Sequence, residues 1–172
     1  MNPINIEKHT ITALVEDQPG VLNRISSMFR RRGYNISSLA VGKSEAAGLS
    51  RMTFVVEGDV RTVEMVTKNL HKLVEVIKVS DISEESAVSR ELALIRVKSD
   101  VSNRNEIMQI VDIFRAKIVD ISPETLIVEV TGDEIKVNSL VDLLSAFGVY
   151  EVMRTGKIAM NRGVTFDSER KN

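Results

Sequence analysis

The sequence predicts an α+β protein built from two consecutive β-α-β-β-α-β units. Both halves contain short alternating apolar stretches, which are typical of half-buried strands. Apolar residues at helical spacing follow the first and third of these stretches in each half. A polar, apolar-poor segment, SDISEESAVSR, separates the halves and indicates a linker. This element order is that of the ferredoxin-like fold.

The first half opens with an expected strand at residues 9–15, in which Ile11, Ala13 and Val15 share one side. A helical stripe follows at once from Val21, and Gly33 is expected to end that helix as a left-handed cap. The remaining elements of this half are strands at residues 34–41 and 52–56, a helix marked by Val63, Val66, Leu70 and Leu73, and a strand at 74–82.

The second half repeats the pattern without visible sequence similarity to the first half. Its expected elements are a strand at residues 91–97, a helix around 107–114, strands at 117–121 and 126–130 joined by a turn at 122–124, a helix around 137–144 ended by Gly148, and a strand from 149. The expected division is a first domain at 8–82, a linker at 83–90, a C-terminal ferredoxin-like domain at 91–163 and a polar tail at 164–172.

Composition excludes several classes of protein. The 172 residues contain no cysteine, which excludes disulfides, thiolate metal sites and a cysteine nucleophile. The net charge is −1, without the basic excess of a general nucleic-acid binder, and aromatic residues make up only 4%. No segment approaches the roughly 20 apolar residues of a membrane helix, and the N-terminus lacks a signal-peptide core. We therefore expect a cytoplasmic protein that binds neither nucleic acid nor membrane.

The sequence contains no recognisable catalytic or metal-binding pattern, so we expect no catalytic residue and no metal site. No G-x-S-x-G or phosphate-binding glycine loop is present. His9 and His71 lack a second ligand at metal-binding spacing and are interpreted as surface or capping residues. The run Arg30-Arg31-Arg32 fits the negative end of a helix dipole, with binding of a phosphate or an acidic partner as the alternative.

The stretch EDQPGVLNRI, residues 16–25, places proline and glycine where a helix begins. In one interpretation it is structural: Asp17 caps the helix, Pro19 lies in the first turn, and Asn35 forms a turn. In the other, the free amides of Gly20, Val21 and Leu22 bind a carboxylate.

In the second interpretation Asp17 or Asn35 would hold an ammonium group. Val21, Leu22, Ile36 and Leu39 would form apolar walls. Together these groups suit a small aliphatic amino acid, and the residues alone leave both interpretations open.

The run from His9 to Asp59 resembles an ACT domain, the ferredoxin-like module that binds amino acids in metabolic regulators. More closely, the chain is similar to the regulatory small subunits of acetohydroxyacid synthase, also called acetolactate synthase. The motifs that carry this resemblance, in order, are RRGYNISSL, GLSRMT, HKLVEVIKV, RELALIRV and RTGKIAMNRG. The resemblance covers residues 9–163.

The resemblance implies a non-catalytic subunit that activates a separate catalytic large subunit and confers feedback inhibition by valine or another branched-chain amino acid. It implies that the partner, not this chain, carries thiamine diphosphate, magnesium and FAD. It also implies a homodimer formed through the ACT domains, with effector sites at that interface.

For the effector site, the resemblance nominates Asp17, Gly20, Val21 and Leu22 of one chain with Asn35 and Ile36 of its mate. The family often has asparagine at the position of Asp17; a carboxylate there attracts an ammonium and repels a carboxylate. Two alternatives are a stand-alone tandem-ACT regulator of gene expression and a dimerisation module without a ligand.

Overall fold

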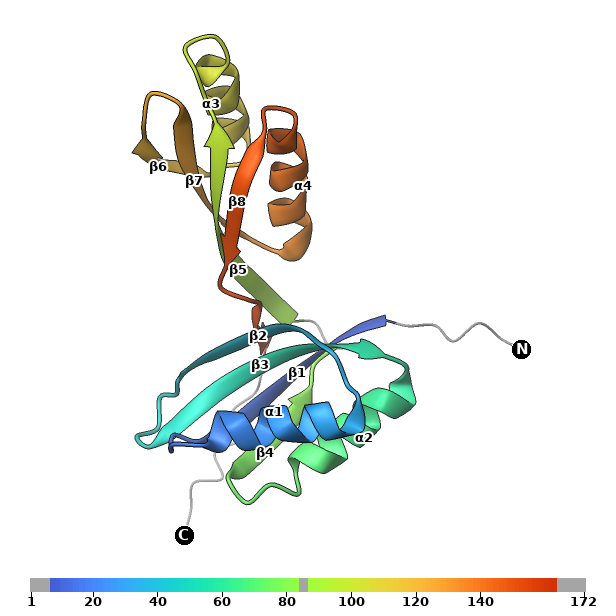
Figure 1. Cartoon of the computed structure of the whole chain (residues 1–172). Helices are drawn as coiled ribbons and strands as arrows, with labels where there is room; N and C mark the ends of the chain where they lie inside the picture. Colours follow the sequence, from blue (N-terminus) through green and yellow to red (C-terminus); the bar gives the residue numbers. More distant parts are fainter. Residues whose placement is uncertain (1–6, 84–86, 164–172) are drawn as a thin grey trace, which may run out of the picture. The chain divides into compact units, whose positions relative to one another are not determined.

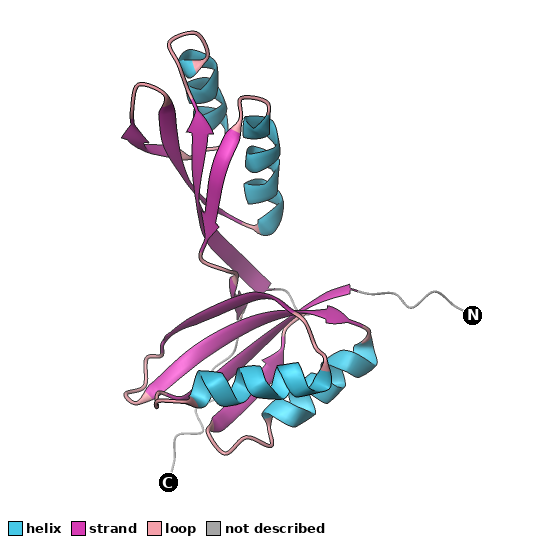
Figure 2. Cartoon of the chain, viewed as in Figure 1, coloured by secondary structure: helices cyan, strands magenta, loops and turns pink. Residues whose placement is uncertain are grey.

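The computed structural model describes residues 7–83 and 87–163, which fall into two compact units. The first unit consists of two segments, one up to Val88 and one from Ala159 onward. The second unit spans Ser89–Ile158. Each unit contains the order β-α-β-β-α-β, with helices packed on one face of an antiparallel sheet (Figure 2). The predicted α+β class with two ferredoxin-like units is confirmed.

The first unit is a four-stranded sheet in the order β2-β3-β1-β4, covered on one face by two helices (Figure 1). Its elements are β1 (Glu7–Glu16), α1 (Val21–Arg32), β2 (Ile36–Lys43), β3 (Leu49–Gly58), α2 (Val60–Leu70) and β4 (Val76–Asp81). β1 and β3 are central and pair in an unbroken antiparallel register, with Ala13 opposite Met52. β2 forms one edge and pairs only with β3.

The core of the first unit lies between the sheet and the helices. Ile11, Ala13 and Val15 alternate toward it, as predicted, and α1 contributes Ile25 and Phe29. The ring of Phe29 stacks on that of Phe54, with 5.4 Å between the centroids. The same alternation places His9 on the covered face, where it is 8% exposed, so the interpretation of His9 as a surface residue is wrong.

The first helix of this unit ends as its sequence indicates, whereas α2 ends at Leu70, before Leu73 of the expected helical stripe. Gly33 has φ 70°, and the amides of Gly33 and Tyr34 donate to Arg30 and Phe29, which confirms the predicted left-handed cap. Because Tyr34 is used in that cap, β2 begins two residues later than expected. His71 caps the end of α2. At the start of α2, the Asp59 Oδ1 accepts hydrogen bonds from the Thr62 amide at 2.8 Å and the Thr62 hydroxyl at 2.6 Å.

The second unit repeats the architecture, with strand order β6-β7-β5-β8. Its elements are β5 (Ala87–Lys98), α3 (Arg104–Ile113), β6 (Lys117–Ile121), β7 (Thr125–Gly132), α4 (Glu134–Ser145) and β8 (Val149–Arg154). The core contains Ile95, Val128 and Leu140, all fully buried. The predicted turn between β6 and β7 is confirmed, and the Ser122 amide donates to the Thr125 carbonyl at 2.9 Å.

Besides shifts of a few residues at the ends of several elements, two larger differences from expectation occur. β5 begins at Ala87, so the last four residues of the expected linker 83–90 are strand. A further short strand, β9 (Ile158–Asn161), pairs with β5, although no element was predicted there. Both differences have one cause: β9 and β5 lie far apart in the sequence, and no local pattern reveals such a pairing.

No helix in residues 7–83 or 87–163 is both long and apolar enough to cross a membrane.

Hydrogen bonds from the Thr62 hydroxyl and amide hold the pKa of the Asp59 carboxyl below its usual range. A carboxyl with a lowered folded-state pKa stabilises the fold above its unfolded pKa of about 3.9, and this contribution is lost as the pH falls through the folded value. Asparagine also caps a helix but has no ionisable group. We therefore expect the melting temperature of Asp59→Asn to fall less than that of the wild type as the pH is lowered. Asp59→Ala should lower the melting temperature at neutral pH as well. Thermal unfolding followed by circular dichroism from pH 7 to acid tests both; identical pH profiles for wild type and Asp59→Asn would contradict the argument.

Candidate functional site

The turn between β1 and α1 differs from the predicted cap. The helix begins at Val21, and Gly20 is its N-cap residue, with φ 91° in the left-handed region. Glycine suits this position because other residues are strained there. Pro19 precedes the cap and does not lie in the first turn of the helix, so that part of the structural interpretation is wrong.

Asp17 does not cap the helix. No side chain hydrogen-bonds to the first turn of α1 within the described residues. The backbone amide of Asp17 donates instead to the Gly48 carbonyl at 2.8 Å, which ties the end of β1 to the turn before β3. The residue is exposed, so its carboxylate is available to a ligand.

The first turn of α1 therefore presents backbone donors. The Val21 amide is 3.4 Å from the Gln18 carbonyl, a long contact, and the described chain offers no backbone acceptor to the Gly20 and Leu22 amides. Such amides at the positive end of a helix form an anion site. A Cβ placed on Gly20 would meet nothing within 4 Å, so the approach to these donors is open.

The apolar residues at the helix start have different environments. Leu22 is 47% exposed and can contact a ligand, whereas Val21 is 6% exposed and belongs to the core. Val21 can therefore offer its amide but not an apolar wall. Ile36 and Leu39 are half-buried and pack at the margin of the same core.

One chain does not bring the predicted site residues together. Asp17, Gly20 and Leu22 lie at the N-terminal end of α1, whereas Asn35 and Ile36 follow its C-terminal end. A helix of 12 residues separates the two groups by about 18 Å. Asn35 lies just before β2 and Ile36 begins it. Because β2 is an edge strand in the described structure, its outer side is open to another chain.

Neither histidine belongs to a metal site, and no group of three or more His, Asp or Glu in the described residues could hold a metal ion. Arg30, Arg31 and Arg32 form the last turn of α1, where cations suit the negative end of the helix dipole.

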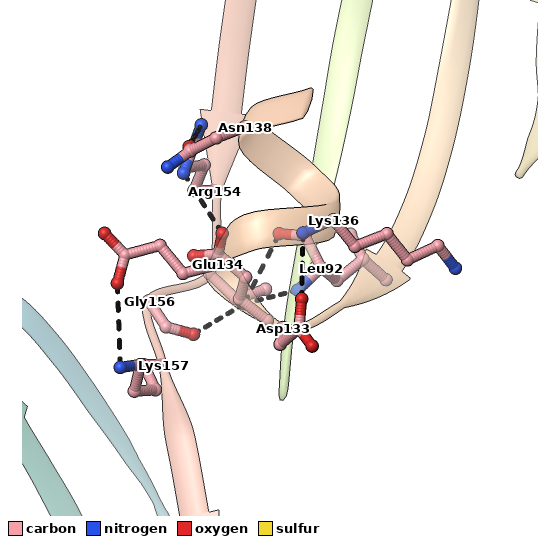
Figure 3. A network of polar contacts seen from close by, with 10 residues as sticks. Leu92, Asp133, Glu134, Lys136, Asn138, Arg154, Gly156 and Lys157 are labelled. Carbon is pink, nitrogen blue, oxygen red and sulfur yellow. Dashed lines mark hydrogen bonds and ion pairs between the residues drawn. The ribbon is translucent and has the colours of Figure 1, made fainter. Parts of the chain in front are cut away.

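A second polar region, at the end of β8, carries the RTGKIAMNRG motif, to which we assigned no role from the sequence. The Arg154 guanidinium bonds to the Glu91 carboxylate at 3.0 Å and to the Asn138 amide oxygen at 2.7 Å. Lys157 pairs with Glu134 at 3.6 Å, beside the start of α4, where Asp133 accepts from the Lys136 amide (Figure 3). These contacts hold residues 154–157 against β5 and α4.

The family-model comparisons match both units. Residues 11–78 match a model described as "AHAS small subunit-like ACT domain", and residues 90–163 match a model described as "Small subunit of acetolactate synthase".

Relatives match along nearly the whole chain. A protein of Archaeoglobus fulgidus named "Probable acetolactate synthase small subunit" is 57% identical over 156 residues, which cover 91% of this chain and 98% of that protein. The "Acetolactate synthase small subunit" of Mycolicibacterium smegmatis is 48% identical over 155 residues, covering 90% and 91%. The crystal structure of a small subunit from Thermotoga maritima superposes with a TM-score of 0.86 at 46% identity, covering 93% of this chain and 100% of that one.

Glu91 is 9% exposed, so the carboxylate of its ion pair is largely shielded from water, whereas the Arg154 side chain is 33% exposed. We expect Glu91→Gln to lower the free energy of unfolding of the second unit by about 1 to 2 kcal/mol, because a charged hydrogen-bond partner is removed from Arg154. The matched control is Glu151→Gln, since Glu151 pairs with Arg96 at 3.5 Å on the exposed surface; it should cost less than about 0.5 kcal/mol. Urea unfolding measures the free energy of unfolding of both variants. Equal losses in the two would show that the Glu91–Arg154 pair stabilises the protein no more than an exposed surface pair does.

Proposed function

Because the chain belongs to the family of acetolactate synthase small subunits, we propose that it activates the catalytic large subunit of that enzyme and makes it sensitive to valine. The chain is a regulatory subunit and not itself an enzyme, and a catalytic large subunit is its partner. The observation that supports valine sensitivity is the start of α1, which no side chain caps and where open space surrounds the missing side chain of Gly20.

In the proposed site, the effector's carboxylate accepts hydrogen bonds from the Gly20, Val21 and Leu22 amides. The ammonium group of the effector lies near Asp17, whose carboxylate is not used as a helix cap. The exposed part of Leu22 contacts the aliphatic side chain. A branched-chain amino acid has all three of these groups, and valine is the effector we propose.

The second half of the proposed site comes from another copy. Asn35 and Ile36 of the same chain are about 18 Å away along α1, so they cannot reach this effector. We assign dimerisation and effector binding to the ACT domain, residues 8–82. In that homodimer, the edge strands β2 of two copies adjoin, and Asn35 and Ile36 of the mate complete the site.

Inhibition then follows from linkage. An effector between two copies binds most tightly to one arrangement of the pair, and it shifts the complex toward that arrangement by its difference in affinity. The catalytic cofactors, thiamine diphosphate, magnesium and FAD, belong to the large subunit in this proposal. The cytoplasmic location expected from the sequence stays a prediction.

Reconstitution tests the function directly. Addition of this chain to the catalytic large subunit of its own organism should raise acetolactate formation several-fold, and valine should return the rate toward that of the large subunit alone. Leucine and isoleucine, assayed in parallel, identify the preferred effector. Absence of both stimulation and sensitivity to any of the three amino acids would refute the proposal.

Gly20→Asp tests the effector site. The added carboxylate lies at the open helix start, repels the effector's carboxylate and strains a backbone with φ 91°. We expect valine affinity, measured by calorimetry, to fall by about tenfold or more, equivalent to at least about 1.4 kcal/mol.

The control is Gly148→Asp, the same change at a left-handed glycine with φ 97° in the second unit. It should leave the valine affinity within about twofold of wild type, because Gly148 belongs to the second unit and contributes no group to the proposed site. An unchanged valine affinity in Gly20→Asp would show that the helix start does not bind the effector, even if reconstitution succeeds.

A further inference from the structure

A groove of 360 Å³ lies between the two helices of the first unit. It is lined by Met28, Arg31 and Arg32 of α1, by Asn69 of α2 and by Lys72 and Leu73, which follow α2. The lining contains cations, one amide and two apolar side chains, and no carboxylate. A volume of this size is within the range of small-molecule sites, about 300–1,000 Å³.

The cations of this groove have no acidic partner in the described residues, although other cations nearby do. Lys68 pairs with Glu64 at 3.2 Å, and Arg24 of α1 pairs with Glu75. Within residues 7–83 and 87–163, no aspartate or glutamate carboxylate forms an ion pair with Arg31, Arg32 or Lys72. The groove therefore holds a local positive charge in a protein whose net charge is −1.

Asn69 supplies the independent observation. It is 5% exposed, and its buried Nδ2 has no hydrogen-bond acceptor in the described structure. A buried donor is normally satisfied by protein or water, so an unsatisfied one beside three cations indicates a missing acceptor. Favourable interaction with helix dipoles accounts for cations in the last turns, but it leaves the amide of Asn69 unexplained.

We propose that this groove binds the phosphate group of a small molecule. A phosphate carries several acceptor oxygens and up to two negative charges, which match two guanidinium groups, one ammonium and one amide donor. Asn69 lines the same groove as Arg31, Arg32 and Lys72, whose exposed side chains are free to reorient around a bound phosphate. Met28 and Leu73 give the remainder of the ligand an apolar surface. The site is separate from the helix start and does not depend on valine binding.

The test is a nuclear magnetic resonance titration of the full ¹⁵N-labelled chain. The probes are inorganic phosphate and ribose 5-phosphate, each at constant ionic strength set with sodium chloride. We expect saturable shifts of the Asn69 side-chain amide and of the backbone amides of Arg31 and Lys72. Tighter binding of the sugar phosphate would identify an organic phosphate as the ligand, and equal or tighter binding of inorganic phosphate would identify the free ion; either supports the site.

Variants separate the groove from general surface charge. The double variant Arg31→Gln/Arg32→Gln should weaken phosphate binding about tenfold, and Lys72→Gln, just after the other helix, should also weaken it. Arg30→Gln is the control, because Arg30 belongs to the same basic run but does not line the groove; it should change the affinity less than about twofold. Linear, unsaturable shifts, or an equal loss in Arg30→Gln, would overturn the proposal.

Discussion

Each sheet of this protein has an apolar face that must be covered by two helices, and this requirement sets the position of everything else. In the first unit it places Ile11, Ala13 and Val15 against α1 and α2. The chain must then reverse between β1 and α1 within a few residues, and it does so through Gly20 in a left-handed conformation. The uncapped helix start is thus a result of how the core is closed.

The two ends of α1 belong to two different proposed sites. The N-terminal end belongs to the effector site, and the C-terminal end lines the phosphate groove. The N-terminal end offers backbone amides, whereas the C-terminal end offers cations next to a buried amide. Asn35 and Ile36 follow the C-terminal end, on an edge strand, so they can serve an effector at the N-terminal end only from another copy. In the proposed site, therefore, two copies are needed to bind one effector.

Local sequence pattern predicted what depends on local geometry. The strands and helices of both units, the left-handed cap at Gly33 and the turn at Ser122 all follow from periodicity and from glycine or proline chemistry. The pattern did not predict β9, the early start of β5 or the contact of Glu91 with Arg154, whose partners are 63 residues apart. At the helix start, the residue types allowed Asp17 to be a cap or a ligand group. Backbone geometry showed that it is not a cap.

The free edge of β2 also has a consequence for the cell. The strand ISSLAVGK contains no proline and one charged residue, at its end, so little in it opposes pairing with an unrelated strand. An unpartnered copy exposes this edge and is the form most prone to aggregate. In the proposed homodimer, β2 of a second copy covers this edge, so self-association of the chain would also protect it from aggregation.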